Sequence, residues 1–212
     1  MTLALRILEG KVYKIPGGRG FMLTLALYNT YDTRRLHEAH LRAIARAGPI
    51  AYAFDFHLAL VGFPLEGKPL DVAEEIAGNT TIGRGGKYLV ELARNNKFHL
   101  LDFPRGGFPP QFGTPVATTR KPSEEKKITP LEVARRAVSG ESFILLVGLG
   151  RRGLPEEIFK LARYHMEITG KGVSLETCTA IGAIPSKIRT LMEALQWKTD
   201  GQKNWRGYSS QL

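Results

Sequence analysis

Apolar runs of strand length alternate along this chain with amphipathic segments of helical length. Residues 21–28 (FMLTLALY) form a short apolar run between Gly20 and Asn29, which is typical of a buried strand. Residues 34–47 have helical spacing, and the pair Gly48-Pro49 predicts the end of that helix before a second strand at 50–54. A strand, a helix and a strand joined by short links predict a βαβ unit with parallel strands.

The second half of the chain continues this alternation. Thr129 begins the capping box Thr-Pro-Leu-Glu, with proline at the first helical position, so a helix is expected to start there. A final helix is expected at 174–197, interrupted at Gly182 and Pro185. The other expected helices are 71–77, 87–95 and a segment opened by Pro155, and the other expected strands are 98–103, 116–119, 143–147 and 164–168. The sequence therefore predicts one α/β domain over residues 1–212, with a mostly parallel sheet and helices on both faces.

The composition supports a folded core and excludes several kinds of site and classes of protein. Hydrophobic residues make up 43% of the chain, as in ordinary globular domains. The lone cysteine, Cys178, excludes a disulfide within the chain and a cysteine-based zinc site, and the scattered histidines predict no metal site. No apolar run approaches the roughly 20 residues of a membrane-spanning helix. The first ten residues lack the pattern of a signal peptide, so we expect a cytoplasmic protein.

The charge balance points to a polyanionic partner. Lysine and arginine outnumber the acidic residues by 30 to 20, which gives a formal net charge of +10. Such an excess attracts nucleic acid, and we therefore expect an RNA or DNA partner. The segment 198–212 is polar and basic, and we expect it to be mobile.

A glycine-rich loop follows the strand expected at 143–147. Residues 148–153 (GLGRRG) match the dinucleotide fingerprint, and Glu167 lies about 20 positions on, where a ribose-binding carboxylate would stand. A nicotinamide-dependent oxidoreductase is therefore one hypothesis. Pro155 delays the next helix past the last glycine, however, and a second glycine loop, 169–172 (TGKG), follows the next strand. Two such loops after adjacent strands favour a pocket for an adenosine moiety.

The two loops also resemble a known family. VGLGRRGLPEEI and ITGKGVSLETCTAIGAI are similar to the second and third motifs of the SPOUT, or α/β-knot, RNA methyltransferases. The matching positions are Gly148, Gly153 and Leu154 in the first loop and Gly172, Ser174 and Leu175 in the second, and Glu176-Thr177 is similar to a variant of the third motif. Arg42 stands six residues before Gly48, the spacing of the functional arginine in the family's first motif.

This resemblance implies a fold, a cofactor and an assembly. The expected fold is SPOUT-like, with a C-terminal trefoil-type knot at 143–197 that binds S-adenosylmethionine, and with a homodimer packed through the last helix. The expected substrate is tRNA or rRNA, with a ribose 2′-hydroxyl as one acceptor. The residues expected to hold the cofactor are Leu146, Gly148, Leu149, Gly150, Gly153, Ile168, Gly170, Val173 and Leu175.

The sequence departs from the family pattern at positions that carry chemistry. Gly150 stands where the second motif has glutamate, Glu176 where the common third motif has asparagine, and Leu36 where the first motif often has asparagine. These departures leave open a second hypothesis, in which the protein has the knot fold and binds RNA with little or no methyltransferase activity.

Candidate roles follow from side-chain chemistry. Arg42 is the first candidate for catalysis, because a guanidinium can lower the pKa of a hydroxyl and bind the adjoining phosphate. Glu176 is the second, as a base or as a partner for the sulfonium, although an acid at a helix start also has a purely structural use. His37 and His40 are weaker candidates for a base. The arginines expected to bind RNA are Arg34, Arg35, Arg46, Arg151 and Arg152, the first three on one helix with Arg42, where they could equally bind phosphate without chemistry. The loop 104–115, with two phenylalanines, is either an ordinary surface loop or a platform for an unpaired base.

Overall fold

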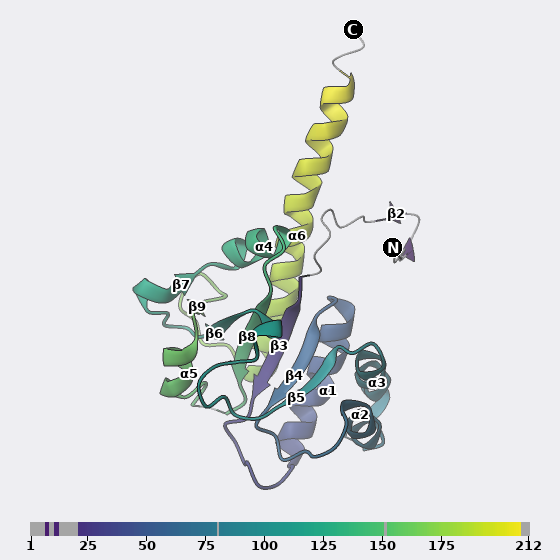
Figure 1. Cartoon of the computed structure of the whole chain (residues 1–212), viewed down its shortest axis with the longest axis vertical. Coiled ribbons are helices and arrows are strands. Elements are labelled where there is room, and N and C mark those ends of the chain that lie inside the picture. Colours follow the sequence, from purple (N-terminus) through teal and green to yellow (C-terminus); the bar gives the residue numbers. More distant parts are fainter. Residues whose placement is uncertain (1–6, 9–10, 13–20, 80, 151, 209–212) are drawn as a thin grey trace.

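Seven parallel strands form one sheet at the centre of the molecule (Figure 1). The computed structural model describes residues 7–8, 11–12, 21–79, 81–150 and 152–208, and describes side chains at 21–79, 81–150 and 152–196. The strand order is β5-β4-β3-β8-β6-β9-β7, and every pairing between neighbours is parallel. The strands are β3 (Leu23–Tyr28), β4 (His57–Val61), β5 (Phe98–Leu101), β6 (Thr114–Thr118), β7 (Lys127–Ile128), β8 (Phe143–Gly148) and β9 (Tyr164–Met166). The predicted mostly parallel sheet is confirmed.

The two most buried strands lie side by side in the middle of the sheet. All six residues of β3 are buried, and Leu25 stands opposite Leu58 of β4 on one side and Leu145 of β8 on the other. Side chains alternate between the faces of a strand, so β3 contributes leucines to one face and Ala26 to the other. This burial on both faces explains why these segments read as continuous apolar runs.

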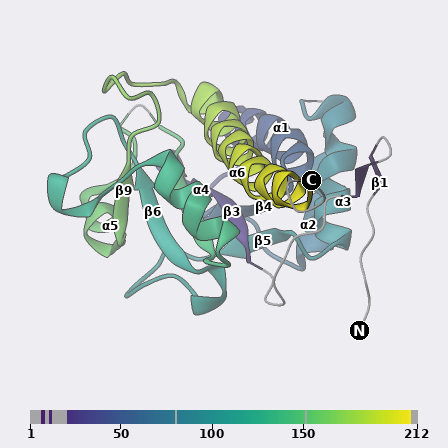
Figure 2. The same ribbon diagram turned by 90° about the horizontal axis from the view of Figure 1, so that it is seen from above.

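Helices cover both faces of the sheet, unequally. The helices are α1 (Glu38–Ala53), α2 (Pro69–Ala77), α3 (Gly86–Arg94), α4 (Pro130–Val138), α5 (Glu156–Leu161) and α6 (Thr177–Tyr208), and short 3-10 turns occupy Gly83–Gly85, Pro110–Phe112 and Glu124–Lys126. Five of them, α1 to α4 and α6, pack into the larger core on one face. On the other face α5 packs with Leu154 and Phe112. Figure 2 shows α6 crossing beside α1 and α4.

The first helix differs from the prediction at both ends. It begins at Glu38 because the carboxylate of Asp32 accepts hydrogen bonds from the backbone N–H groups of Arg34 and Arg35, which gives that segment a turn instead of a helix. It continues through Gly48-Pro49 to Ala53, so the strand predicted at 50–54 is wrong. The second strand is β4, whose apolar run before Gly62 the prediction passed over.

Packing explains why the glycine and proline do not end α1. Gly48 and Ala51 are buried, and a Cβ on Gly48 would lie 3.7 Å from Cβ of Leu89 on α3. The carbonyl of Ala45, which Pro49 leaves without its helical donor, lies against Gly85. Tertiary contacts with α3 and the turn before it therefore stabilise a helix that local propensity would interrupt.

The predicted start of α4 is confirmed, whereas the predicted course of α6 is not. The capping box is confirmed: Thr129 Oγ1 accepts from the N–H of Glu132, and the Glu132 carboxylate accepts from the N–H of Thr129. The predicted interruption of α6 is wrong, since the helix runs through Gly182 and Pro185 with Ile181, Ile184 and Ile188 buried. The backbone of α6 continues to Tyr208, beyond the predicted end at 197, while residues 209–212 and the side chains after 196 lie outside the described part.

Near the start of the chain, β1 (Ile7–Leu8) and β2 (Lys11–Val12) pair as a two-stranded antiparallel hairpin. No helix in the described part of the chain is both long and apolar enough to cross a membrane.

Candidate functional site

The connections from two adjacent central strands leave the sheet in opposite directions. From β3 the chain passes through α1 to β4, and from β8 it passes through α5 to β9, on the other side of the sheet. In open α/β sheets such a divergence opens a crevice at the carboxyl ends of the two strands, where ligands bind. A cavity of about 450 Å³ lies at this place. Its lining residues are Tyr31, Ala39, His40, Arg42, Ala43, Arg46, Leu149, Glu176, Thr177 and Cys178.

The two predicted catalytic residues meet in this cavity. Arg42 comes from α1 and Glu176 from the residue before α6, 134 positions later in the sequence (176 − 42). The Arg42 side chain is 64% exposed, and its ion pair to Glu38 is long at 3.9 Å. Arg46 donates a hydrogen bond to the carbonyl of Arg42, one turn back on α1. Both guanidinium groups are therefore largely available to a ligand.

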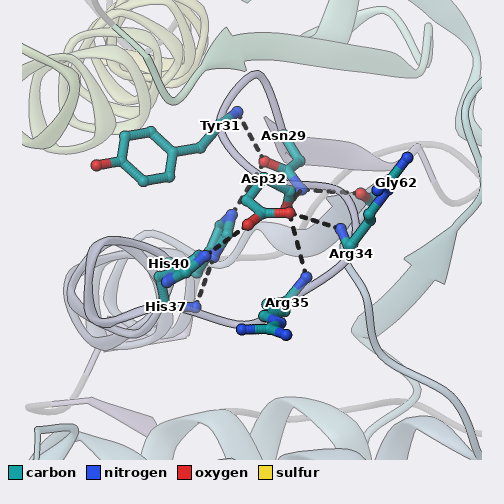
Figure 3. Close-up of polar contacts among 8 residues, drawn as sticks. All are labelled: Asn29, Tyr31, Asp32, Arg34, Arg35, His37, His40 and Gly62. Atoms are coloured by element: carbon teal, nitrogen blue, oxygen red, sulfur yellow. Dashed lines mark hydrogen bonds and ion pairs between the residues drawn. The ribbon is translucent and has the colours of Figure 1, made fainter.

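Asn29 organises the loop between β3 and α1 (Figure 3). Its amide nitrogen donates to the carbonyls of Asp32, at 2.7 Å, and Gly62, at 2.9 Å. Its amide oxygen accepts from the N–H of Tyr31 at 2.9 Å and contacts Nε2 of His40 at 3.0 Å. One buried side chain thus ties the loop to the end of β4 and to the first turn of α1.

His40 is a structural residue in this network. Its Nδ1 accepts from the N–H of His37 at 3.0 Å, so Nε2 carries the proton that is donated to Asn29. Burial, followed by the nearby His37, lowers the pKa of His40, which agrees with a neutral ring. Because both ring nitrogens are engaged, the suggestion that His40 acts as a base is not supported.

The arginines of this loop differ from the prediction. Arg34 and Arg35 are exposed and lie before α1, so they do not share a helix face with Arg42 and Arg46. Their backbone is held by Asp32, whose other oxygen lies 2.6 Å from Nε2 of His37. The hydrogen bond from His37, with those from the two arginine N–H groups, lowers the pKa of Asp32 to about 2.

The first glycine loop is shaped by contacts that exclude side chains. A Cβ on Gly148 would lie 2.5 Å from the backbone of Gly153, because the loop doubles back on itself. The N–H of Gly150 donates to Thr30 Oγ1 at 2.8 Å. Gly153 has a φ of +69°, and the space beside it, where a side chain would begin, is open. The loop therefore presents bare backbone at the carboxyl end of β8.

The second glycine loop is closed by Glu167. The Glu167 carboxylate accepts from the N–H and hydroxyl of Thr169 and from the N–H of Gly170. Burial raises the pKa of Glu167, but the hydrogen bonds from Thr169, Gly170 and Gly172 outweigh burial and lower it overall. A carboxylate so engaged in its own loop is a poor match for the ribose-binding acid of a dinucleotide fold.

Glu176 and Thr177 connect this second loop to the first. The Glu176 carboxylate accepts from the N–H groups of Cys178, at 2.9 Å, and Thr179, at 3.4 Å, so it caps the start of α6. Thr177 Oγ1 lies 3.2 Å from the carbonyls of both Gly148 and Leu149 and donates to them. The helix-capping use of Glu176 is therefore present in the structure.

The remaining predicted residues occupy several environments. Leu149 lines the cavity, Leu146 is buried within β8, and Val173 is 52% exposed. Arg152 is exposed, whereas Arg151 lies outside the described residues. Sequence analysis did not predict Tyr31. The available signal was an aromatic residue two positions after Asn29, the polar residue that follows β3. The remaining predicted cofactor residues, Gly148, Gly150, Gly153, Ile168, Gly170 and Leu175, belong to the two loops and the strand ends that carry them.

The phenylalanines of the loop 104–115 do not form a platform. Phe112 is 3% exposed and packs edge-on against His99, with ring centroids 5.0 Å apart. Phe108 is half-buried against the same core as α5. This loop covers the second face of the sheet, and stacking of an RNA base on these rings is not supported.

No group of three or more histidine, cysteine or acidic side chains that could hold a metal ion occurs in the described part of the chain.

Comparison with known proteins places the chain in a family. The model of the family described as "Protein of unknown function (DUF531)" matches residues 23–189. The chain belongs to the DUF531 family. The curated protein named "Uncharacterized protein MJ0224", from Methanocaldococcus jannaschii, is 51% identical to the DUF531 chain over 167 residues, which cover 78% of this chain and 92% of the relative.

Solved structures share the fold at low sequence identity. A "probable methylase family protein" from Haemophilus influenzae matches the DUF531 chain with a TM-score of 0.55 and 16% identity, over 89% of this chain and 77% of its own. A "Probable Methyltransferase" from Bordetella pertussis matches with a TM-score of 0.51 and 13% identity, over 81% and 96%. A protein described as a "putative RNA methyltransferase of the TrmH family", from Porphyromonas gingivalis, matches with a TM-score of 0.50 and 16% identity, over 82% of this chain and 62% of its own. The DUF531 chain thus has a SPOUT-like α/β fold, as its motifs predicted.

Proposed function

We propose that this protein is an S-adenosylmethionine-dependent methyltransferase that modifies tRNA or rRNA. The observation that carries the proposal is the cavity at the carboxyl ends of β3 and β8, where Arg42, Leu149 and Glu176 line one space. Three segments that the family resemblance had singled out separately are thereby brought together. The structures that share the fold are described as those of a methylase family protein and of methyltransferases, which supports the same reaction class.

The two glycine loops fit the adenosine part of such a cofactor. Gly153 and Gly170 both have positive φ, and among the described residues no atom other than those of the glycine and its chain neighbours lies within 4 Å of the place where a Cβ would start. Bare backbone with open space beside it can approach a flat purine and ribose closely and offer N–H and carbonyl groups. When bound, the cofactor would supply a methyl group on a sulfonium. We propose that Gly148, Leu149, Gly150, Gly153, Ile168, Gly170, Val173 and Leu175, with the backbone near Leu146, hold it.

Arg42 is the proposed catalytic residue. Methyl transfer is an in-line displacement, so the protein must align the acceptor and stabilise the charge that develops on its oxygen. A guanidinium beside a ribose 2′-hydroxyl would favour loss of the hydroxyl proton, and it could bind the neighbouring phosphate at the same time. The Arg42 side chain can reach an acceptor because it is 64% exposed and its ion pair to Glu38 is long, at 3.9 Å.

Glu176 is proposed to act while its carboxylate keeps its hydrogen bonds to the start of α6. Its carboxylate caps α6 through two backbone N–H groups, and a base would have to give up those bonds. A carboxylate fixed at the cavity wall instead stabilises a positive charge in the cavity and orients the start of α6. We therefore assign Glu176 an electrostatic role in the proposed reaction.

Exposed arginines of the cavity and of the two loops that contribute Tyr31 and Leu149 to it would bind the RNA backbone. Arg34 and Arg35 on the loop, Arg46 on α1 and Arg152 on the glycine loop are all exposed. With the net charge of +10 they form the electrostatic footprint expected of a nucleic-acid-binding protein. The C-terminal knot, the homodimer through α6 and the RNA-binding role of Arg151 remain predictions of the family resemblance.

One observation favours a second function. Gly150 occupies the place of the family's glutamate, and a Cβ there would lie 2.9 Å from Thr30 Oγ1. The loop has thus adapted to the absence of a side chain, which would suit an RNA-binding protein with the same fold and little or no activity. The oxidoreductase hypothesis is weaker, because Glu167 is engaged in its own loop and α5 starts after Pro155, beyond the last glycine.

Calorimetry separates these functions. The full chain is titrated with S-adenosylmethionine, S-adenosylhomocysteine and NAD, and then incubated with total tRNA or rRNA and methyl-labelled donor. We expect binding of both sulfur cofactors and transfer of label to RNA that disappears after ribonuclease digestion. RNA binding without methyl-donor binding would support the second function instead. Binding of NAD with no heat from the methyl donor would overturn the proposal.

A further inference from the structure

Tyr31 presents an aromatic ring to the cavity beside the two arginines. Tyr31 is 63% exposed, the largest exposure among the large hydrophobic residues of the described part. Because Tyr31 lines the cavity together with Arg42 and Arg46, its exposed ring is available to a ligand bound there. In Figure 3 the Tyr31 ring projects away from the polar network that holds its backbone.

The ring is held in place although it is exposed. The N–H of Tyr31 donates to the amide oxygen of Asn29, which is itself buried. The ring stands nearly perpendicular to His40, with an interplanar angle of 87° and ring centroids 5.8 Å apart, and at 73° to His37. A pre-oriented ring loses little conformational entropy when a flat group stacks on it.

Polar groups near Tyr31 are already hydrogen-bonded within the protein, so a ligand in the cavity would be recognised mainly by stacking on the ring and by charge. Both ring nitrogens of His40 are bonded within the protein, and the Thr177 hydroxyl donates to the carbonyls of Gly148 and Leu149. Arg42 and Arg46 supply positive charge in the same cavity, and the carboxylate of Glu176 there is bonded to the backbone N–H groups of Cys178 and Thr179. A flat aromatic group linked to phosphates matches this combination, and a cavity of about 450 Å³ lies in the size range of small-ligand sites.

We propose that this cavity receives one unpaired nucleotide of an RNA strand, with its base stacked on Tyr31 and its flanking phosphates bound by Arg42 and Arg46. The inference deepens the proposed function, because the nucleotide in this cavity would be the one presented for methylation. A base in a duplex is already stacked on both sides, so the site selects single-stranded or looped RNA.

The test uses binding alone, with no methyl donor present. A fluorescent single-stranded oligoribonucleotide, an RNA duplex of the same sequence and inorganic polyphosphate are bound to the wild-type chain and to the variants Tyr31→Leu and Tyr31→Phe. Stacking of a base on an aromatic ring contributes about 1–3 kcal/mol, which corresponds to roughly 5- to 150-fold in affinity. We expect Tyr31→Leu to weaken single-strand binding within that range and Tyr31→Phe to restore it.

The other ligands and variants act as controls. Polyphosphate has no bases and the duplex has none free, so Tyr31→Leu should leave the binding of both unchanged. Tyr52→Leu, which removes a 37%-exposed tyrosine from the other end of α1, should have no effect on any ligand. Arg42→Ala and Arg46→Ala should each weaken polyphosphate and single strands alike, and should each reduce the salt dependence of single-strand binding by about 0.7 in the log–log slope.

Two results would overturn this inference. One is an unchanged affinity of Tyr31→Leu for the single strand, and the other is an equal loss for single strand, duplex and polyphosphate, which would indicate only a disturbed loop. The binding test does not depend on whether the protein carries out the proposed methyl transfer. If the wild-type chain binds no S-adenosylmethionine but Tyr31→Leu loses single-strand affinity selectively, the proposed reaction fails and the nucleotide site stands.

Discussion

The backbone N–H of Gly150 donates a hydrogen bond to Thr30 Oγ1 at a distance of 2.8 Å, across the carboxyl ends of β8 and β3. The residues are 120 positions apart in the sequence. The contact fastens the first glycine loop to the loop that carries Tyr31 and leads to Arg42. It also explains how the chain accommodates glycine where the family resemblance leads one to expect glutamate.

Gly150→Ala is expected to destabilise the protein by about 1 kcal/mol, because its Cβ would lie 2.9 Å from Thr30 Oγ1 and would push the hydroxyl away from its donor. Urea unfolding followed by circular dichroism measures the change. In a Thr30→Ala background the same substitution should cost less, since the crowded hydroxyl is already gone. Equal costs in both backgrounds would contradict a direct coupling of the two residues.

Arg42→Ala is expected to reduce methyl transfer by about 10²- to 10³-fold while leaving S-adenosylmethionine binding unchanged. The reason is that Arg42 lies on α1, apart from the two glycine loops, and would act on the acceptor. Single-turnover transfer of labelled methyl to RNA and calorimetry with the cofactor measure the two properties. Arg135→Ala, which removes an exposed arginine from α4, is the matched loss of charge and should keep full activity. Normal turnover in Arg42→Ala would show that this part of α1 only docks RNA.

Gly153→Val is expected to abolish binding of S-adenosylmethionine. The φ of +69° at Gly153 is unfavourable for valine, and the added side chain would enter the open space beside the loop. Calorimetry gives the affinity. Gly140→Val is a close control, because Gly140 also has a positive φ, of +99°, and open space beside it, but lies in the turn after α4. We expect Gly140→Val to lower the free energy of unfolding by about 1–2 kcal/mol with no loss of affinity.

Two stacked histidines under the loop 104–115 should make folding stability depend on pH. His57 Nδ1 lies 2.9 Å from His99 Nε2, and the rings are almost parallel. Burial, with His99 next in effect, lowers the pKa of His57 to about 4, and burial also lowers that of His99. As the pH falls from about 6.5 to about 4, the unfolded chain therefore binds protons that the folded chain does not, and stability is lost over this range.

Urea midpoints measured between pH 7.5 and 4.5 test this dependence. The double variant His57→Gln/His99→Gln should give a flatter profile than the wild type between pH 6.5 and 4.5. A profile of the double variant that is as steep as that of the wild type would assign the dependence to other groups, such as His40.

The sequence by itself determined the elements whose local and tertiary preferences agree. The apolar runs at 21–28 and 143–147 became β3 and β8, because strands buried on both faces need continuous apolar side chains. The capping box at Thr129 fixed the start of α4, since its hydrogen bonds are made within four residues. The motif spacing predicted Arg42, Leu149 and Glu176 as site residues, and all three line one cavity.

Where local signals compete, the tertiary structure alone decided which conformation the chain adopts. In an isolated peptide Pro49 would end the helix, but in the folded protein the packing of Gly48 against Leu89 stabilises α1, which continues to Ala53. Asp32 delays the start of α1 by capturing the N–H groups of Arg34 and Arg35, and sequence spacing alone put those arginines on the wrong element. The cavity itself is likewise a tertiary result. It joins residues more than 130 positions apart because β3 and β8 are neighbours in the sheet and their connections diverge, and such pairing leaves no local trace in the sequence.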